Sequence, residues 1–131
     1  RGAIPAAFGL EPDIGIALDT TIAADTPGVP EDEAVCRSGA GVGIKIMDGA
    51  SLSAPHLVRE FIALAERNAI AYQLEVLPLG GTDAAGIQRS RAGVPVITLS
   101  TPSRYVHTVQ EAVHRDDLAA TLALLLAWLK D

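Results

Sequence analysis

The 131-residue sequence has few aromatic residues and almost no cysteine. Cys36 is the single cysteine, so no disulfide can form within the chain, and we expect a small, half-buried thiol in a reducing, cytoplasmic setting. Aromatic residues make up 4% of the sequence and hydrophobic residues 49%. This composition excludes disorder and predicts a mostly aliphatic core, which a chain of this length can bury.

Basic residues and long apolar runs are also scarce. Ten Lys and Arg against 16 Asp and Glu give a formal net charge of −6, with no basic stripe to neutralise phosphates, so we expect no nucleic acid partner. The apolar run Leu118–Leu129 is far shorter than the roughly 20 residues that span a bilayer. It predicts a buried helix and no membrane anchor. The Gly-x-Ser-x-Gly and Gly-x-x-x-x-Gly-Lys-Ser/Thr motifs are absent, which removes two common classes of catalytic or nucleotide-binding site.

Strand and helix patterns alternate along the chain. Strands are predicted at 14–18, 44–47, 72–77 and 94–99, and helices at 55–68, from 82 or 83 to about 93, and from 116 onward. The strand at 14–18 is continuous and apolar, as in a fully buried strand. Residues 24–43 are rich in Gly and Pro and predict a loop. The order of elements predicts a single α/β domain over residues 1–131, a three-layer sandwich with a mixed, partly parallel sheet.

Two of the predicted helices have clear terminal signals. Pro55 suits the first turn of the helix at 55–68, with Ser53 as a candidate N-cap. Asp116 and Asp117 suit the positive end of the last helix dipole. Its expected packing face consists of Leu118, Leu122, Leu125 and Leu129.

Polar residues follow three of the predicted strands, at the strand ends where α/β sheets place their sites. Asp19 follows the first strand, the segment Gly80–Asp83 follows the third, and Arg104–His107 follows the last. A carboxylate and an imidazole from separate strands are suitable metal ligands. On spacing alone, however, an aspartate such as Asp19 is more often a turn or cap residue. The glycine-rich segment fits a tight turn with a helix cap or a close approach to a bound peptide, and the two interpretations are compatible.

Four further residues have less specific signals. His56 lies in the first turn of a helix and His114 precedes the acidic start of another, so both are expected at the surface. Asp25 is expected to hold an Asx-type turn, with metal ligation or orientation of the site as alternatives. Arg104 is expected either to pair with a nearby carboxylate or to contact an acidic substrate side chain.

Five segments in register resemble one known family. They are Asp19–Gly28, Tyr72–Glu75, Gly80–Ala84, Gly93–Pro95 and Arg104–Thr108. Together they resemble the C-terminal half of the tetrahedral aminopeptidases, the family that includes glutamyl and deblocking aminopeptidases. The resemblance runs almost end to end along the chain.

The resemblance implies a set of site residues. Asp19 and His107 correspond to the terminal ligands of a dinuclear centre, one to each of two divalent ions, zinc or cobalt. Gly81, Thr82 and Asp83 correspond to a loop beside the metals that binds substrate. Family members carry a His-x-Asp motif, a bridging Asp and a Glu-Glu pair before this segment, and no Glu-Glu pair occurs in this chain. We therefore expect part of a zinc-peptidase-like catalytic domain, with the general-base glutamate upstream of Arg1.

The implied function is that of a cytoplasmic, dinuclear metallo-aminopeptidase that removes N-terminal residues from short peptides. The resemblance also implies a large hollow homo-oligomer, typically a dodecamer, and an inactive segment when the upstream part of the enzyme is missing. Two alternatives stay open. One is a non-catalytic fragment or subunit with the same fold, and the other is a related dinuclear metal amidohydrolase such as a deacylase.

Overall fold

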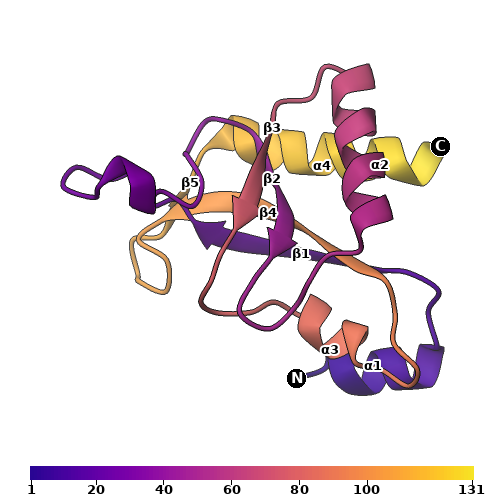
Figure 1. Ribbon diagram of the computed structural model, residues 1–131. Coiled ribbons are helices and arrows are strands. Elements are labelled where there is room, and N and C mark those ends of the chain that lie inside the picture. Colours follow the sequence, from indigo (N-terminus) through magenta and orange to yellow (C-terminus); the bar gives the residue numbers. More distant parts are fainter.

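A five-stranded sheet forms the centre of the computed structural model, which describes residues 1–131 (Figure 1). Its strands are β1 (Gly15–Ile22), β2 (Val42–Met47), β3 (Tyr72–Val76), β4 (Val96–Arg104) and β5 (Ala112–Val113). The strand order is β1-β4-β2-β3, with β5 paired to the end of β4. β1 pairs parallel to β4 and β2 parallel to β3, whereas β2 and β4 are antiparallel. The predicted mixed, partly parallel sheet is confirmed.

Four helices cover the two faces of this sheet. They are α1 (Ala3–Leu10), α2 (Pro55–Arg67), α3 (Ala84–Gln88) and α4 (Arg115–Lys130), and a short 3-10 helix, η1 (Glu31–Glu33), lies in the loop before β2. The adjacent residues Val96 and Ile97 of β4 point to opposite faces. Ile97 packs in the core beside α2 and α4, and Val96 packs with Ala17 and with Ala84 of α3. Helices therefore lie on both sides of the sheet, and the three-layer prediction is correct (Figure 1).

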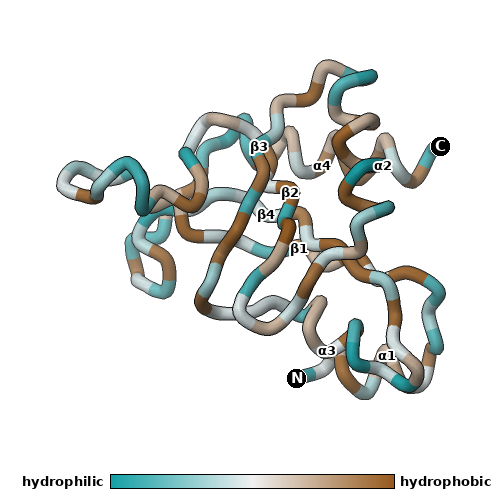
Figure 2. The backbone as a smooth tube through the Cα atoms, in the orientation of Figure 1, coloured by the Kyte–Doolittle hydropathy of each residue, from teal (hydrophilic) through white to brown (hydrophobic).

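The main core lies between the sheet and the α2–α4 layer. Its nine buried residues are Val42, Ile44, Leu57, Phe61, Leu64, Ala65, Ile97, Leu99 and Leu124. The Phe61 ring stacks on Trp128 with 5.8 Å between ring centroids. Figure 2 shows hydrophobic residues on the strands and on α2, and mostly hydrophilic residues on the projecting loop around η1. Pro55 begins α2 as predicted, but the N-cap is Ala54 and not Ser53.

The packing face predicted for α4 is correct only at Leu125, which is partly buried against the main core. Leu118, Leu122 and Leu129 are each more than half exposed, and the buried residues of the helix are Asp117, Thr121 and Leu124. Leucine, alanine and tryptophan residues together occupy most of the circumference of α4, so the hydrophobic pattern does not single out one buried stripe. Two polar side chains select the buried stripe instead, because Asp117 accepts hydrogen bonds from a loop and Thr121 lies 3.1 Å from Thr101 Oγ1.

Other elements also differ from prediction: β4 continues to Arg104, beyond the predicted end at Leu99, and β5 was not predicted. β1 is not fully buried, since it lies at the sheet edge and Leu18 is 56% exposed. α3 ends at Gln88, several residues earlier than expected, and a turn with positive φ at Arg91 and Gly93 leads into β4. α1 was not predicted, because its eight residues carry none of the polar positions that reveal a helical period.

None of the helices in the chain combines the length and the apolar character that crossing a membrane requires.

Cys36 is more deeply buried than the half-buried position expected for it, and desolvation raises the pKa of its thiol to about 12.

Leu124→Ala should lower the free energy of unfolding by about 2–5 kcal/mol, because Leu124 is fully buried and truncation leaves a cavity. Leu122→Ala, on the exposed side of the same helix, should change it by less than about 0.5 kcal/mol. Urea unfolding of both variants measures the difference. Equal destabilisation would contradict the orientation of α4 described above.

Candidate functional site

One cavity on the sheet face opposite α2 and α4 brings together most of the expected site residues. It has a volume of about 190 Å³. Its lining residues are Asp19, Thr20, Thr21, Ile22, Lys45, Leu77, Leu79, Gly80, Gly81, Thr82, Val106 and His107. Asp19 comes from β1, His107 from the loop after β4, and Gly81 from the loop after β3. The two expected metal ligands, 88 positions apart in sequence, therefore line the same cavity, while their role as ligands stays a prediction.

The site does not form at a shared edge of strand ends, as the sequence argument assumed. Asp19 lies within β1, opposite Ser100 of β4, and not beyond the end of the strand. β3 runs antiparallel to β1 and β4, so its carboxyl end lies at the other end of the sheet. The residues meet because two loops fold over the sheet face, one after β3 and one after β4.

His107 sits in a turn with an uncommon backbone conformation. Tyr105 and His107 have φ angles of 58° and 62°. Residues other than glycine rarely adopt such angles, and those that do cluster at functional sites. Thr108 closes the turn, since its backbone N–H and its hydroxyl both donate to Tyr105 O, at 3.1 and 2.7 Å. The His107 ring is exposed and makes no hydrogen bond to protein. Asp19 is also exposed, with only the Thr20 N–H donating to its Oδ1 at 2.8 Å. Both side chains are thus available to a ligand.

A buried ion pair lies beneath the cavity, and the sequence analysis missed it. Lys45 on β2 and Glu75 on β3 are 1% and 0% exposed, and the Lys45 ammonium donates to Glu75 Oε1. The Thr21 hydroxyl of β1 donates to the same oxygen at 2.5 Å. Glu75 Oε2 is buried without a partner. The signal was present in the sequence, since Lys45 and Glu75 each alternate with apolar strand residues and so point to the face opposite the core.

A second carboxylate anchors the glycine-rich loop. Asp48 is buried, accepts from the backbone N–H groups of Ala50 and Ser51 at 2.8 and 2.6 Å, and lies 3.3 Å from the Thr82 hydroxyl that donates to it. Burial opposes ionisation, but the hydrogen bonds from Ala50 and Ser51 outweigh it and hold the pKa of Asp48 below its usual value. Gly81 lies so close to this corner that a Cβ there would be 2.8 Å from Ala50 Cβ.

Asp83, the third residue expected to bind substrate, does not line this cavity. It is at the N-cap position of α3, where its side chain makes no cap hydrogen bond. It lines a separate cavity together with Arg89 and Arg91. Gly81 and Thr82 alone of this group face Asp19 and His107.

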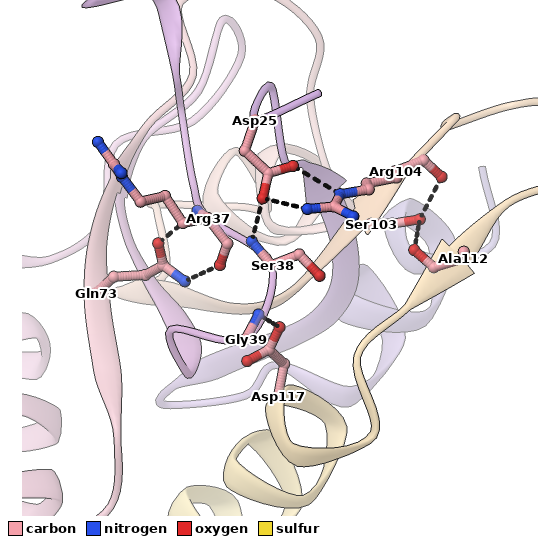
Figure 3. Close-up of polar contacts among 9 residues, drawn as sticks. All are labelled: Asp25, Arg37, Ser38, Gly39, Gln73, Ser103, Arg104, Ala112 and Asp117. Carbon is pink, nitrogen blue, oxygen red and sulfur yellow. Dashed lines mark hydrogen bonds and ion pairs between the residues drawn. The ribbon is translucent and has the colours of Figure 1, made fainter. Parts of the chain in front are cut away.

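Arg104 and Asp25 form a two-point ion pair beside the site (Figure 3). Arg104 Nε lies 2.9 Å from Asp25 Oδ1 and its Nη2 lies 3.0 Å from Asp25 Oδ2, while the Ser38 N–H donates to Oδ2 at 2.9 Å. The hydrogen bonds from Arg104 lower the pKa of Asp25, even though partial burial raises it. The expected pairing of Arg104 with a carboxylate is confirmed. Asp25 bonds to residues far away in the chain, and not within an Asx-type turn as expected.

The loop between β1 and β2 is fixed from two further elements (Figure 3). Asp117 of α4 is fully buried and accepts from the Gly39 N–H at 2.7 Å and the Gly41 N–H at 2.8 Å. Gln73 of β3 accepts from the Arg37 N–H at 2.8 Å and donates to the Arg37 carbonyl at 3.0 Å. These bonds explain why Asp117 is buried, a role that its position at a helix start did not reveal.

The remaining two histidines are exposed, as expected. His56 lies in the first turn of α2 and makes no contact with the cavity. His114 has an additional role as the N-cap of α4, where its Nδ1 accepts from the Asp116 N–H at 3.2 Å.

Two side chains on the cavity are of the kinds that can ligate a metal ion. An exposed carboxylate and an exposed imidazole on one cavity are ligands that zinc and cobalt accept. No group of three or more His, Cys, Asp or Glu side chains in residues 1–131 is placed to hold a metal ion. Asp19 and His107 therefore fit as two members of a ligand set whose other members would come from outside this chain.

The chain is similar to known proteins in both sequence and structure. The family model described as M42 glutamyl aminopeptidase matches residues 1–124. The chain belongs to this family. It is 39% identical to a putative aminopeptidase of Acetivibrio thermocellus over 126 residues, which cover 96% of this chain and 38% of that protein. The resemblance stated from the five sequence segments is thus confirmed.

Solved structures of M42 relatives share the fold. The aminopeptidase APDkam598 from the archaeon Desulfurococcus kamchatkensis superposes with a TM-score of 0.97 at 38% identity, over 100% of this chain and 38% of that one. The protein PhTET1-12s, described as a dodecamer, superposes with a TM-score of 0.81 at 27% identity, over 98% of this chain and 37% of that one. The chain spans less than two fifths of the length of these relatives.

Glu75→Gln should lower the free energy of unfolding by about 3–5 kcal/mol, because it leaves the buried Lys45 ammonium without a charge partner. Glu31→Gln removes an ion pair with Arg37 in which both side chains are mostly exposed, and should cost less than about 0.5 kcal/mol. Chemical denaturation at neutral pH compares the two. A Glu75 variant as stable as the Glu31 variant would show that the buried pair contributes nothing.

Asp25→Asn should flatten the dependence of stability on pH in acid. The pKa of Asp25 is lower in the folded chain than in the unfolded chain, so its contribution is complete above about pH 4 and is lost as the pH falls through the folded value. Urea unfolding from roughly pH 5 to pH 3 should show a smaller loss for the variant than for the unmodified chain. An identical slope would exclude this role of the pair.

Proposed function

We propose that this chain is the C-terminal catalytic segment of a metal-dependent aminopeptidase that removes N-terminal residues from short peptides. The observation that supports this most is the single cavity lined by Asp19, His107, Gly81 and Thr82, at the positions that the family resemblance marks as functional. Membership of the M42 aminopeptidase family supports the peptidase role.

Two divalent ions, zinc or cobalt, are proposed as cofactors, with Asp19 a ligand to one and His107 a ligand to the other. When bound, such ions polarise the scissile carbonyl and lower the pKa of a metal-bound water. The donor types fit, and neither side chain is committed to another strong interaction. The general-base glutamate and the bridging carboxylate are proposed to lie in the segment upstream of Arg1.

The loop after β3 is proposed to bind the peptide through Gly81 and Thr82. Gly81 has no side chain, so a peptide backbone can approach it closely, and the bond between Thr82 and Asp48 holds the loop in place. Asp83, which lines a different cavity, is not included in this proposal. The hydrophobic lining residues Leu77, Leu79 and Val106 provide apolar surface for the substrate.

The wider assembly follows from the same family. A homo-oligomer is proposed because the relative PhTET1-12s is described as a dodecamer. The upstream segment of the same enzyme is the proposed intramolecular partner, since the chain covers 38% of the relative from Acetivibrio thermocellus. A cytoplasmic location is proposed on the scarcity of cysteine.

This chain alone should not hydrolyse peptides, and adding the missing upstream segment, covalently or in trans, should restore activity. The chain supplies at most one terminal ligand to each ion and no general base, so a metal-bound water would lack the group that deprotonates it. The assay compares the two preparations on aminoacyl-anilides and dipeptides with zinc or cobalt in excess.

Robust turnover by the isolated chain would refute the proposal that this chain supplies only part of the active site, because all catalytic residues would then lie within residues 1–131. Absence of turnover with the upstream segment present would favour a non-catalytic subunit. Cleavage of N-acyl amides in preference to free N-termini would favour a deacylase.

A further inference from the structure

We infer that Asp25 and Arg104 are positioning residues that hold the His107 turn over the cavity and thereby set the affinity of the metal site. The inference rests on the proposed function, since it takes His107 as a metal ligand. It concerns two side chains that do not line the cavity themselves.

The pair connects the segment after β1, the strand that carries Asp19, with the end of β4, from which the chain enters the His107 turn. Arg104 is the last residue of β4, three positions before His107, and Asp25 follows the end of β1 by three residues. Between them, the Ala23 N–H donates to Ser103 O at 2.9 Å and ends the β1–β4 pairing. Beyond this point, the segment after β1 and the end of β4 are joined by the two guanidinium–carboxylate bonds at 2.9 and 3.0 Å. A two-point contact fixes orientation as well as distance, because both planar groups must align.

The turn itself has few restraints of its own. Its hydrogen bonds are local, from Thr108 to Tyr105 and from the Gln110 N–H to the Thr108 hydroxyl at 3.2 Å. None of them reaches the body of the sheet, and the His107 ring has no partner. Two residues with positive φ make the observed conformation costly, so contacts outside the turn must maintain it. The ion pair lies at the amino-terminal end of the turn, directly before Tyr105.

The carboxyl-terminal end of the turn is anchored separately. The Ser103 hydroxyl donates to Glu111 Oε1 at 3.0 Å, and Arg104 pairs with Ala112 of β5. Figure 3 shows Ser103, Arg104 and Ala112 beside the ion pair. With both ends of the turn held, the position of His107 depends on whether Arg104 stays aligned.

Asp25 is itself held in place, so the pair can transmit a fixed position. Its side chain is 14% exposed, and the Ser38 N–H binds it from a loop that Asp117 fixes through Gly39. Arg104 is therefore aligned against a carboxylate that cannot easily move. In an exposed ion pair such as that of Arg67 and Asp131, no further hydrogen bond holds the carboxylate in place.

The test uses the full-length enzyme, stripped of metal and titrated with Co²⁺ while visible absorption reports on the ligand sphere. Asp25→Asn and Arg104→Gln should each weaken the binding of one of two ions by about 10- to 100-fold, the range found when partners of metal ligands are lost. The double variant should bind no more weakly than the single ones, because the two residues act as a unit. Arg104→Lys, which keeps the charge but loses the two-point contact, should be intermediate. Arg67→Gln is the matched control and should bind both ions normally.

His107→Ala separates this inference from the proposed function. If His107→Ala weakens one ion and the Asp25 and Arg104 variants do not, the positioning role is overturned while the ligand assignment stands. If His107→Ala leaves both ions bound normally, the assignment fails and the inference fails with it. A further outcome is that the Arg104→Gln and Arg104→Lys variants unfold at a lower temperature without metal and still bind Co²⁺ as the unmodified enzyme does. That result would show that the ion pair only stabilises the fold, and it would also overturn the inference.

Discussion

The buried charge of Lys45 constrains the whole sheet face on which the cavity lies. An ammonium group that is 1% exposed needs a carboxylate, and Glu75 on the neighbouring strand supplies it. Glu75 must approach β2 closely, and Gly43 permits this, since a Cβ at that position would lie 3.2 Å from Glu75 Oε2. Thr21 extends the cluster to β1. Three strands are thus joined through polar side chains on one face, while aliphatic packing joins them on the other.

The polar character of this part of the sheet explains why loops form much of the site. α3 covers the apolar part of this face at Ala17 and Val96, whereas connecting segments lie over its polar part around Lys45. Each segment is tied down by a carboxylate: Asp48 holds the loop after β3, Asp25 holds the turn after β4, and Asp117 holds the loop before β2. The cavity is lined by the first two of these segments together with β1 and Lys45. Hydrogen bonds to Asp48 and Asp25 therefore fix the positions of the two loops that line the cavity.

The parts of this structure that sequence reasoning found are those set by local chemistry. Alternation and turn residues located β2, β3 and α2 closely, and the order of elements predicted the mixed sheet and the three layers. The buried stripe of α4 was missed because apolar residues of several kinds surround the helix, and because the loop and strand residues that bind Asp117 and Thr121 lie far away in sequence. The motifs predicted that Asp19 and His107 face one cavity, as they do, while their role as metal ligands stays a prediction. The argument from strand ends was wrong, since only the topology shows that β3 is antiparallel to β1. Alternation places Lys45 and Glu75 on the face opposite the core, but it does not reveal that they pair with each other or that Asp48 binds Thr82, because each partner lies in a different segment of the chain.

The environment of Cys36 gives this chain a built-in probe of its own motions. The thiol lies in the loop before β2, is 2% exposed, and has its pKa raised to about 12, first by desolvation and then by the nearby charge of Glu75. In the closed loop it is therefore protonated and out of reach of reagents near neutral pH. Modification requires the loop to lift, so the labelling rate of Cys36 reports the free energy of a local opening and not only that of global unfolding. Because the same loop carries Ser38, which binds Asp25, that rate would follow the segment that supports the His107 turn without any engineered label.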